Sequence, residues 1–146
     1  MKFLSKSLED TNRLASDFVS EIAKIRRSKA TVVGLYGDLG SGKTTFTQAV
    51  GHALGITDSM QSPTFVIIKK FSIFNFPFLN LYHIDTYRLK NGEELGRLGF
   101  DKLLADPKNL IFIEWADQVA GILPFDHLKL FCRFVDENTR EYILEM

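Results

Sequence analysis

The chain has 146 residues, of which 45% are hydrophobic and 25% are charged, and its 18 basic side chains balance 18 acidic ones. This length favours a single domain over residues 1–146, because it supports one hydrophobic core and is short for two. The neutral balance gives no electrostatic support for tight nucleic-acid binding by the whole chain. No apolar run approaches the roughly 18 residues of a membrane span, so we expect a cytoplasmic protein without membrane contact.

Residues 7–25 predict a surface helix. Ser7, followed three residues later by Asp10, is a capping-box pattern, and Leu14, Phe18 and Ile22 fall on one helical face. The basic run KIRRSK comes next and is interpreted as a last helical turn that complements the negative end of the helix dipole. A contact with RNA is the alternative for these basic side chains.

The next segments predict a strand, a glycine-rich loop and a helix. Residues 31–36, TVVGLY, lack polar alternation and suit a central strand covered on both faces. GDLGSGKTT, residues 37–45, follows directly, and TTFTQAVGHALG predicts a helix from Thr44 that Gly55 closes. FVIIKKF and FLNLYHI then predict two strands around a turn at residues 75–77.

The second half completes the fold pattern. NGEELGRLGFDKLL predicts two short helices separated at Gly96 and Gly99, and NLIFIEW predicts a buried strand that ends in an acid. The tail predicts two strands around a turn at residues 136–139, with Cys132, the only cysteine, as an apolar filler. This order predicts an α/β fold: a P-loop NTPase-like, mostly parallel central sheet with flanking helices and antiparallel additions.

GDLGSGKT matches the P-loop pattern of glycine, four residues, glycine, lysine and a hydroxyl residue. Gly37, Gly40 and Gly42 allow successive backbone N–H groups to turn towards an anion. Lys43 would lie between the β- and γ-phosphates, and the Thr44 hydroxyl would bind Mg²⁺ at the positive end of a helix. The segment therefore predicts nucleotide binding; a structural glycine turn is the alternative.

Four further residues are candidates for the same site. Glu114 and Asp85 stand at the ends of predicted strands, where P-loop proteins place a second acid for the metal; an exposed strand-end acid and a helix cap are the respective alternatives. Trp115 would pack beside the nucleotide or close the core. The Thr64 hydroxyl, in SPTF, could sense the metal or the γ-phosphate, or could belong to a loop that a proline ends.

Five motifs in order resemble the TsaE family, the ATPase of bacterial tRNA threonylcarbamoyladenosine biosynthesis: GDLGSGKTTF, SPTFVI, LYHIDTYRL, EELGRLGFDKLL and IFIEWADQV. The match runs over nearly the whole chain. The resemblance implies a cytoplasmic, Mg²⁺-dependent ATPase that hydrolyses ATP to reset a complex of TsaB and TsaD. It implies contact with tRNA only through that complex.

The resemblance also implies site residues. Lys43, Asp85, Glu114 and Thr64 would be catalytic, and Thr44 with Glu114 would hold Mg²⁺. The residues expected to bind the phosphates are Gly37, Asp38, Leu39, Gly40, Ser41, Gly42, Lys43, Thr44 and Thr45. Thr11 in the first helix and Arg140 in the terminal hairpin would lie around the adenine. Two segments depart from the family pattern, the aromatic FSIFNFPF and the terminal hairpin, and both bear on adenine contacts and the partner surface.

Other functions stay open on the sequence alone. One is a binding module whose ATP-bound state controls docking without turnover. A small-molecule kinase is another, although no arginine-rich lid segment follows the central strands, and no guanine-reading motif supports a GTPase. Arg88 is the best internal candidate for an arginine finger; without an obvious one, we expect slow hydrolysis by the chain alone.

Overall fold

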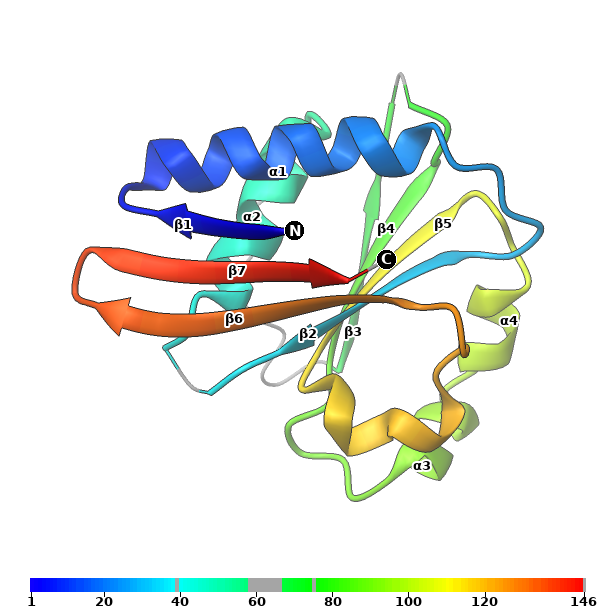
Figure 1. Cartoon of the computed structure of the whole chain (residues 1–146). Coiled ribbons are helices and arrows are strands. Elements are labelled where there is room, and N and C mark those ends of the chain that lie inside the picture. The colour runs from blue at the N-terminus through cyan, green and yellow to red at the C-terminus, as the bar shows by residue number, and fades with distance from the viewer. Residues whose placement is uncertain (39, 58–66, 75, 146) are drawn as a thin grey trace.

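The computed structural model describes residues 1–38, 40–57, 67–74 and 76–145 (Figure 1). In this part of the chain a seven-stranded sheet has the order β1-β7-β6-β2-β5-β4-β3. The strands are β1 (Lys2–Ser5), β2 (Thr31–Tyr36), β3 (Ile68–Ser72), β4 (Asn80–Asp85), β5 (Asn109–Glu114), β6 (Leu128–Asp136) and β7 (Thr139–Glu145). The helices are α1 (Leu8–Ala23), α2 (Lys43–Ala53), α3 (Gly92–Arg97), α4 (Phe100–Leu104) and the 3-10 helix η1 (Ala116–Ile122).

The centre of the sheet is parallel. β6 pairs with β2, β2 with β5 and β5 with β4 in parallel, whereas β3, β7 and β1 are antiparallel additions. The predicted α/β fold with a parallel centre and antiparallel additions is confirmed. The sequence did not predict β1, which pairs with β7 and brings the two termini side by side, with the Met1 ammonium 3.0 Å from the Leu144 carbonyl oxygen (Figure 1).

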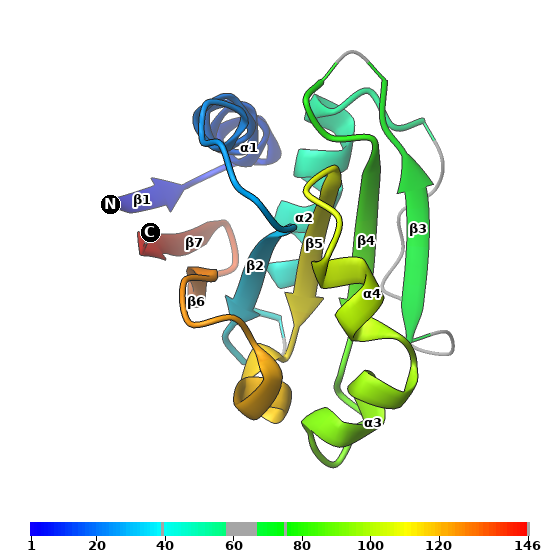
Figure 2. The same cartoon turned by 90° about the vertical axis from the view of Figure 1, so that its right-hand side faces the viewer.

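Helices cover both faces of the central strands. α2 lies behind the sheet and α3 and α4 lie in front of it in Figure 2. Alternate residues of β5 divide between the two cores: Phe112 packs with α1 and α2, and Ile111 and Ile113 pack with α3, α4 and η1. All six residues of β5 are buried, which explains why this strand lacks polar alternation.

α1 begins where the sequence predicts and ends earlier. The Ser7 hydroxyl accepts a hydrogen bond from the Asp10 N–H at 3.1 Å. The helix ends at Ala23, because the N–H groups of Lys24 and Ile25 bond three residues back and tighten the last turn. The prediction of a basic last turn is therefore wrong: as the structure describes α1, its last turn holds no basic residue, and the rest of KIRRSK forms a loop before β2.

The other predicted boundaries differ by a few residues. α3 contains Gly96, so of the two predicted glycines only Gly99 lies between α3 and α4; Gly99 has a φ of 91°, a left-handed conformation that glycine adopts without strain. β4 begins two residues later than predicted and β3 is described from Ile68; residues 65 and 66 of the predicted first strand and residue 75 of the predicted turn lie outside the described residues. The phenylalanine cluster there belongs mainly to the core, as predicted: Phe71 and Phe78 are buried and Phe76 packs partly buried against the same core, whereas Phe74 is exposed.

Cys132 is buried in β6, as the sequence predicts, and burial raises the pKa of its thiol to about 12. An unfolded thiol titrates near about 8.5, so the folded state keeps a proton that the unfolded state loses above that pH. The resulting stability is fully present below about pH 8.5 and is lost as the pH rises towards the folded pKa.

We therefore expect the free energy of unfolding to fall in alkali, by up to about 1.4 kcal/mol per pH unit from this one group above about pH 9. Burial likewise raises the pKa of Tyr142 to about 12 and adds to the loss. Denaturant titrations between neutral pH and about pH 11 measure the slope, and Cys132→Ala should make it shallower. Fast alkylation of the folded thiol at neutral pH would contradict the assignment.

Candidate functional site

The glycine-rich loop joins the carboxyl end of β2 to the start of α2 and borders a cavity of about 560 Å³. In parallel α/β sheets ligands bind at this end of the strands. α2 begins at Lys43, one residue before the predicted start, so its N-terminus faces the cavity. The lining residues are Gly40, Gly42, Lys43, Thr44, Thr45, Asp85, Tyr87, Glu114, Trp115 and Arg140.

At two positions of the loop the backbone lies so close to β6 or β7 that only glycine fits. Gly37 has a φ of 145°, and a Cβ placed there would lie 2.2 Å from the Cys132 carbonyl oxygen. Gly42 has a φ of 104°, and a Cβ there would lie 2.6 Å from the Tyr142 Oη. Glycine at these positions therefore allows the loop to pack directly against β6 and β7 and allows the loop backbone to adopt left-handed conformations.

Lys43 is enclosed at the start of α2, with 5% of its surface exposed. Its Nζ donates to the carbonyl oxygens of Gly37 and Asp38, the latter at 2.9 Å, and lies 4.1 Å from the centre of the Trp115 ring. Burial is the main influence on the ammonium and lowers the pKa of Lys43. A phosphate oxygen in the cavity would offer this cation a charged acceptor in place of two neutral carbonyls.

Glu114 lies at the centre of the site and is 3% exposed. The Thr44 hydroxyl donates to Glu114 Oε1 at 2.8 Å, so the predicted pair of metal ligands is brought together from α2 and β5. His83 Nε2 lies 2.5 Å from the other oxygen, Oε2. The alternative of an exposed strand-end acid is therefore wrong.

The sequence reasoning missed His83. It lies on β4, and the Leu81, His83 and Asp85 side chains share one face of that strand because strand residues alternate. The pairing of Asp85 with Glu114 in the β4–β5 register places this face beside Phe112 and Glu114. The alternation of LYHID was thus a signal that linked His83 to Asp85.

Asp85 lines the cavity beside Glu114 and is 8% exposed. Its Oδ1 accepts a hydrogen bond from the Tyr87 N–H at 2.9 Å, which is the geometry of an Asx turn. The alternative of a helix cap is wrong, because the next helix begins at Gly92 and the Asn91 side chain caps it. The Thr86 hydroxyl lies 2.9 Å from the Glu114 carbonyl oxygen and ties the two strand ends together.

Trp115 lines the cavity rather than the core. Its φ of 60° is the only positive value at a non-glycine residue in the part of the chain that the structure describes. Its ring lies 5.2 Å from the Tyr87 ring and beneath the Lys43 ammonium. Of the two sequence interpretations, packing beside a bound nucleotide fits this position.

Thr11 and Arg140 both line an adjoining cavity of about 250 Å³. This cavity shares the lining residues Gly42, Thr45 and Arg140 with the cavity beside the glycine-rich loop. The Thr11 hydroxyl is buried and lies 2.6 Å from Ser5 Oγ. Arg140 Nη1 donates to the Asp136 carbonyl oxygen at 2.7 Å, and its guanidinium lies 4.6 Å from the centre of the Phe134 ring. The first helix and the terminal hairpin therefore flank the glycine-rich loop, and contact of Thr11 and Arg140 with a nucleotide stays a prediction.

The remaining predicted residues are less informative. Asp38 is exposed, and the buried Ser41 hydroxyl has no hydrogen-bond partner among the described residues. Leu39 and Thr64 lie outside the described residues. Arg88 is exposed and is absent from the described cavity lining, whereas Arg140 belongs to it.

The oxygen donors of the site fit Mg²⁺. A hydroxyl and a carboxylate oxygen, on Thr44 and Glu114, lie 2.8 Å apart at a helix N-terminus. In the described part of the chain no group of three or more His, Cys, Asp or Glu side chains forms a metal cage. Mg²⁺ in nucleotide sites uses one or two protein ligands and completes its coordination with phosphate oxygens and water.

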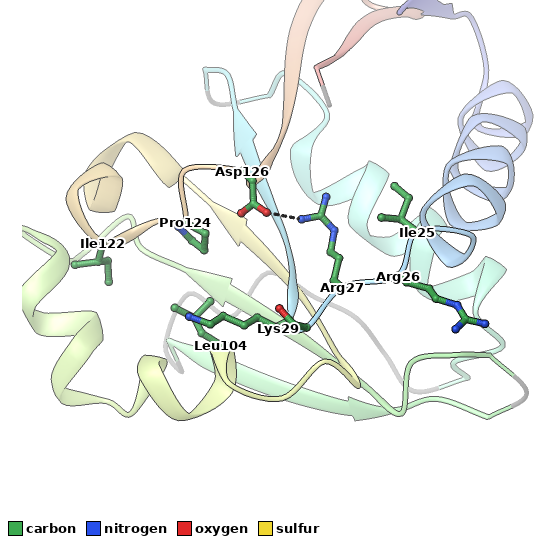
Figure 3. Close-up of a pocket in the computed structure, with 10 residues that line it drawn as sticks. Ile25, Arg26, Arg27, Lys29, Leu104, Ile122, Pro124 and Asp126 are labelled. Carbon is green, nitrogen blue, oxygen red and sulfur yellow. Dashed lines mark hydrogen bonds and ion pairs between the residues drawn. The ribbon is translucent and has the colours of Figure 1, made fainter.

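A second cleft of about 560 Å³ lies at the opposite, amino end of β2 (Figure 3). Figure 3 shows Arg27 turned towards Asp126, at 3.1 Å, while Arg26 points away from the cleft. This cleft contains none of the predicted nucleotide-site residues. An RNA contact by the basic run stays a hypothesis.

None of the described helices is both long enough and apolar enough to cross a bilayer.

The comparisons with known proteins agree with one another. The family model described as "Threonylcarbamoyl adenosine biosynthesis protein TsaE" matches residues 5–142. The TsaE protein of Bacillus subtilis is 39% identical over 110 residues, which cover 75% of this chain and 66% of that protein. The TsaE protein of Rickettsia typhi is 37% identical over 110 residues, covering 75% and 73% of the two chains. That of Haemophilus influenzae is 34% identical over 112 residues, covering 77% and 68%.

A solved structure agrees as well. The crystal structure of Bacillus subtilis YdiB matches with a TM-score of 0.74 and 29% identity, over 97% of this chain and 82% of that one. The alignments with the three sequence relatives span between 66% and 73% of those proteins' lengths.

Proposed function

The chain belongs to the TsaE family of tRNA threonylcarbamoyladenosine biosynthesis proteins, and from this premise we propose that it is a Mg²⁺-dependent ATPase. In this proposal it hydrolyses ATP to reset a complex of TsaB and TsaD proteins between rounds of tRNA modification. The observation that supports it most directly is the convergence of Lys43, Thr44, Glu114 and Asp85 on one cavity at the start of α2.

The loop and α2 bind the triphosphate. Backbone N–H groups of the loop and the positive end of α2 surround the phosphates, and Lys43 exchanges its carbonyl acceptors for phosphate oxygens. Thr44 and Glu114 hold Mg²⁺, which when bound offsets the charge of the β- and γ-phosphates. Trp115 covers the Lys43 side of the cavity and excludes water from it.

In this proposal Asp85 orients the attacking water. It lines the cavity beside Glu114, and the Asx turn with Tyr87 fixes its carboxylate. In-line attack then transfers the γ-phosphoryl group to water, and ADP and phosphate leave. Arg140 is the one arginine among the described lining residues, and its Nη1 donates to the Asp136 carbonyl oxygen, so turnover by the chain alone should be slow. A partner's arginine is worth about 10³–10⁵ in rate where it is supplied in trans.

The experiment that tests the function is a reconstitution with purified TsaB, TsaD and tRNA. The threonylcarbamoyl donor is supplied preformed, so that no other step consumes ATP. We expect repeated rounds of modification with this chain and ATP, and about one round per complex with a non-hydrolysable ATP analogue.

The other outcomes separate the alternatives. Repeated rounds with the analogue would refute the hydrolytic role and support a module whose nucleotide-bound state controls docking. A yield that is indifferent to the chain and to the nucleotide would refute both. Phosphate release is measured in the same samples, so that hydrolysis and product can be compared per round.

A further inference from the structure

His83 is a buried polar residue that the proposed chemistry leaves unused. None of its surface is exposed, and it lies on β4 in register with Phe112. Nε2 contacts Glu114 Oε2 at 2.5 Å, whereas the buried Nδ1 has no hydrogen-bond partner among the described residues. Among the described residues the ring therefore makes one side-chain hydrogen bond, and its partner is the carboxylate of Glu114.

Packing alone gives a poor account of this histidine. A buried ring nitrogen without a partner is unfavourable relative to an apolar side chain of similar volume, which would suit a neighbour such as Phe112. A carboxylate can only accept, so Nε2 donates the proton in this contact. The one side-chain hydrogen bond that His83 makes among the described residues is therefore donated to Glu114.

The length of Glu114 supplies a reason for that bond. P-loop proteins usually place an aspartate at this strand end, and glutamate has one more rotatable bond between backbone and carboxylate. Two donors restrain the longer side chain: His83 holds Oε2 and Thr44 holds Oε1. With Oε2 tied to β4, Oε1 stays directed at the start of α2, where the metal ligands are expected.

We propose that His83 is a positioning residue that fixes the carboxylate of Glu114 for metal binding. The inference rests on the proposed function, since it needs a Mg²⁺–nucleotide complex at this site. Residues of this kind, which orient a metal ligand through a hydrogen bond, typically change metal affinity by about 10–100-fold when they are replaced.

The test compares variants that keep or remove the donor. In His83→Gln the amide nitrogen lies near the position of Nε2 and still donates, while His83→Leu keeps the bulk and donates nothing. Binding of a fluorescent ATP analogue is measured against free Mg²⁺ and in chelator. We expect His83→Leu to raise the Mg²⁺ midpoint by about 10-fold or more and to leave affinity in chelator within about twofold; His83→Gln should stay within about threefold of the unaltered chain.

Matched controls address folding and surface effects. His52 is exposed on α2, so His52→Leu should leave the Mg²⁺ midpoint unchanged. Thermal melts follow the folding of each variant. If His83→Leu does not fold, His83→Asn replaces it, because the shorter amide falls short of Glu114 and the same shift in midpoint is expected.

Three results would overturn the inference. An unchanged Mg²⁺ midpoint in the variant without the donor would make His83 a core residue only. An equal loss of affinity with Mg²⁺ and in chelator would assign the effect to packing. If the unaltered chain bound no nucleotide under either condition, the proposed function would fail, and this inference with it.

Discussion

Lys43→Ala is expected to lower ATP hydrolysis by about 10²–10³-fold, the loss that follows removal of one preorganised donor from an enclosed site. Only Lys43 and Arg140 are cationic among the described residues that line the cavity, and the Arg140 guanidinium contacts the Asp136 carbonyl oxygen and the Phe134 ring. No other described lining cation is therefore placed to replace the Lys43 ammonium at the phosphates. ATP affinity should fall by about 10–100-fold, because a hydrogen bond to a charged group contributes about 1.5–3 kcal/mol.

The measurements are phosphate release at saturating ATP and Mg²⁺ and a calorimetric titration of ATP. Lys102→Ala is the matched control, since this exposed lysine lies on α4, on the other face of the sheet. Lys43→Arg should not restore hydrolysis, because the planar guanidinium does not fit a slot shaped for an ammonium between two carbonyls and the Trp115 ring. Hydrolysis within about threefold of the unaltered chain in Lys43→Ala would contradict the phosphate-binding role.

The parts of the site that the sequence predicts are those that lie close together in the chain or at strand ends. The residues from Gly37 to Thr44 are consecutive in the sequence, so their spacing alone predicts a phosphate site. Asp85 and Glu114 could be placed beside each other because parallel strands end at the same edge of a sheet, and their register pairing agrees.

The parts that the sequence missed depend on partners far away in the chain. β1 is four residues long and has no strong pattern; it forms because β7, near the other end of the chain, offers an unpaired edge. The contact of His83 with Glu114 depends on the register between β4 and β5, which alternation within one strand does not give. The end of α1 was missed because hydrogen bonds that tighten its last turn, rather than composition, stop it at Ala23.

Phe46→Ala is expected to lower the free energy of unfolding by about 3–5 kcal/mol, the usual loss for a buried phenylalanine. Phe46 lies on α2, 1% exposed, and its ring centre is 5.6 Å from that of Phe18, 6.4 Å from Phe112 and 5.4 Å from Tyr142. These contacts join α2 to α1, β5 and β7, so alanine leaves a cavity at the meeting point of four elements. The melting temperature should fall by roughly 6–20 °C, at about 2–4 °C per kcal/mol for a chain of this size.

Urea unfolding and thermal melts measure the change. Phe125→Ala is the control, because loss of this fully exposed ring should change the free energy of unfolding by less than about 0.5 kcal/mol. Phe46 stands two residues after Thr44, so the proposed nucleotide site and the core share α2 and are expected to unfold together. ATP with Mg²⁺, at about 100 times its dissociation constant, should therefore raise the free energy of unfolding by about 2.7 kcal/mol, both in the variant and in the unaltered chain. If Phe46→Ala melted within about 2 °C of the unaltered chain, the contacts of Phe46 with the neighbouring aromatic rings would not be what holds α2 against the core.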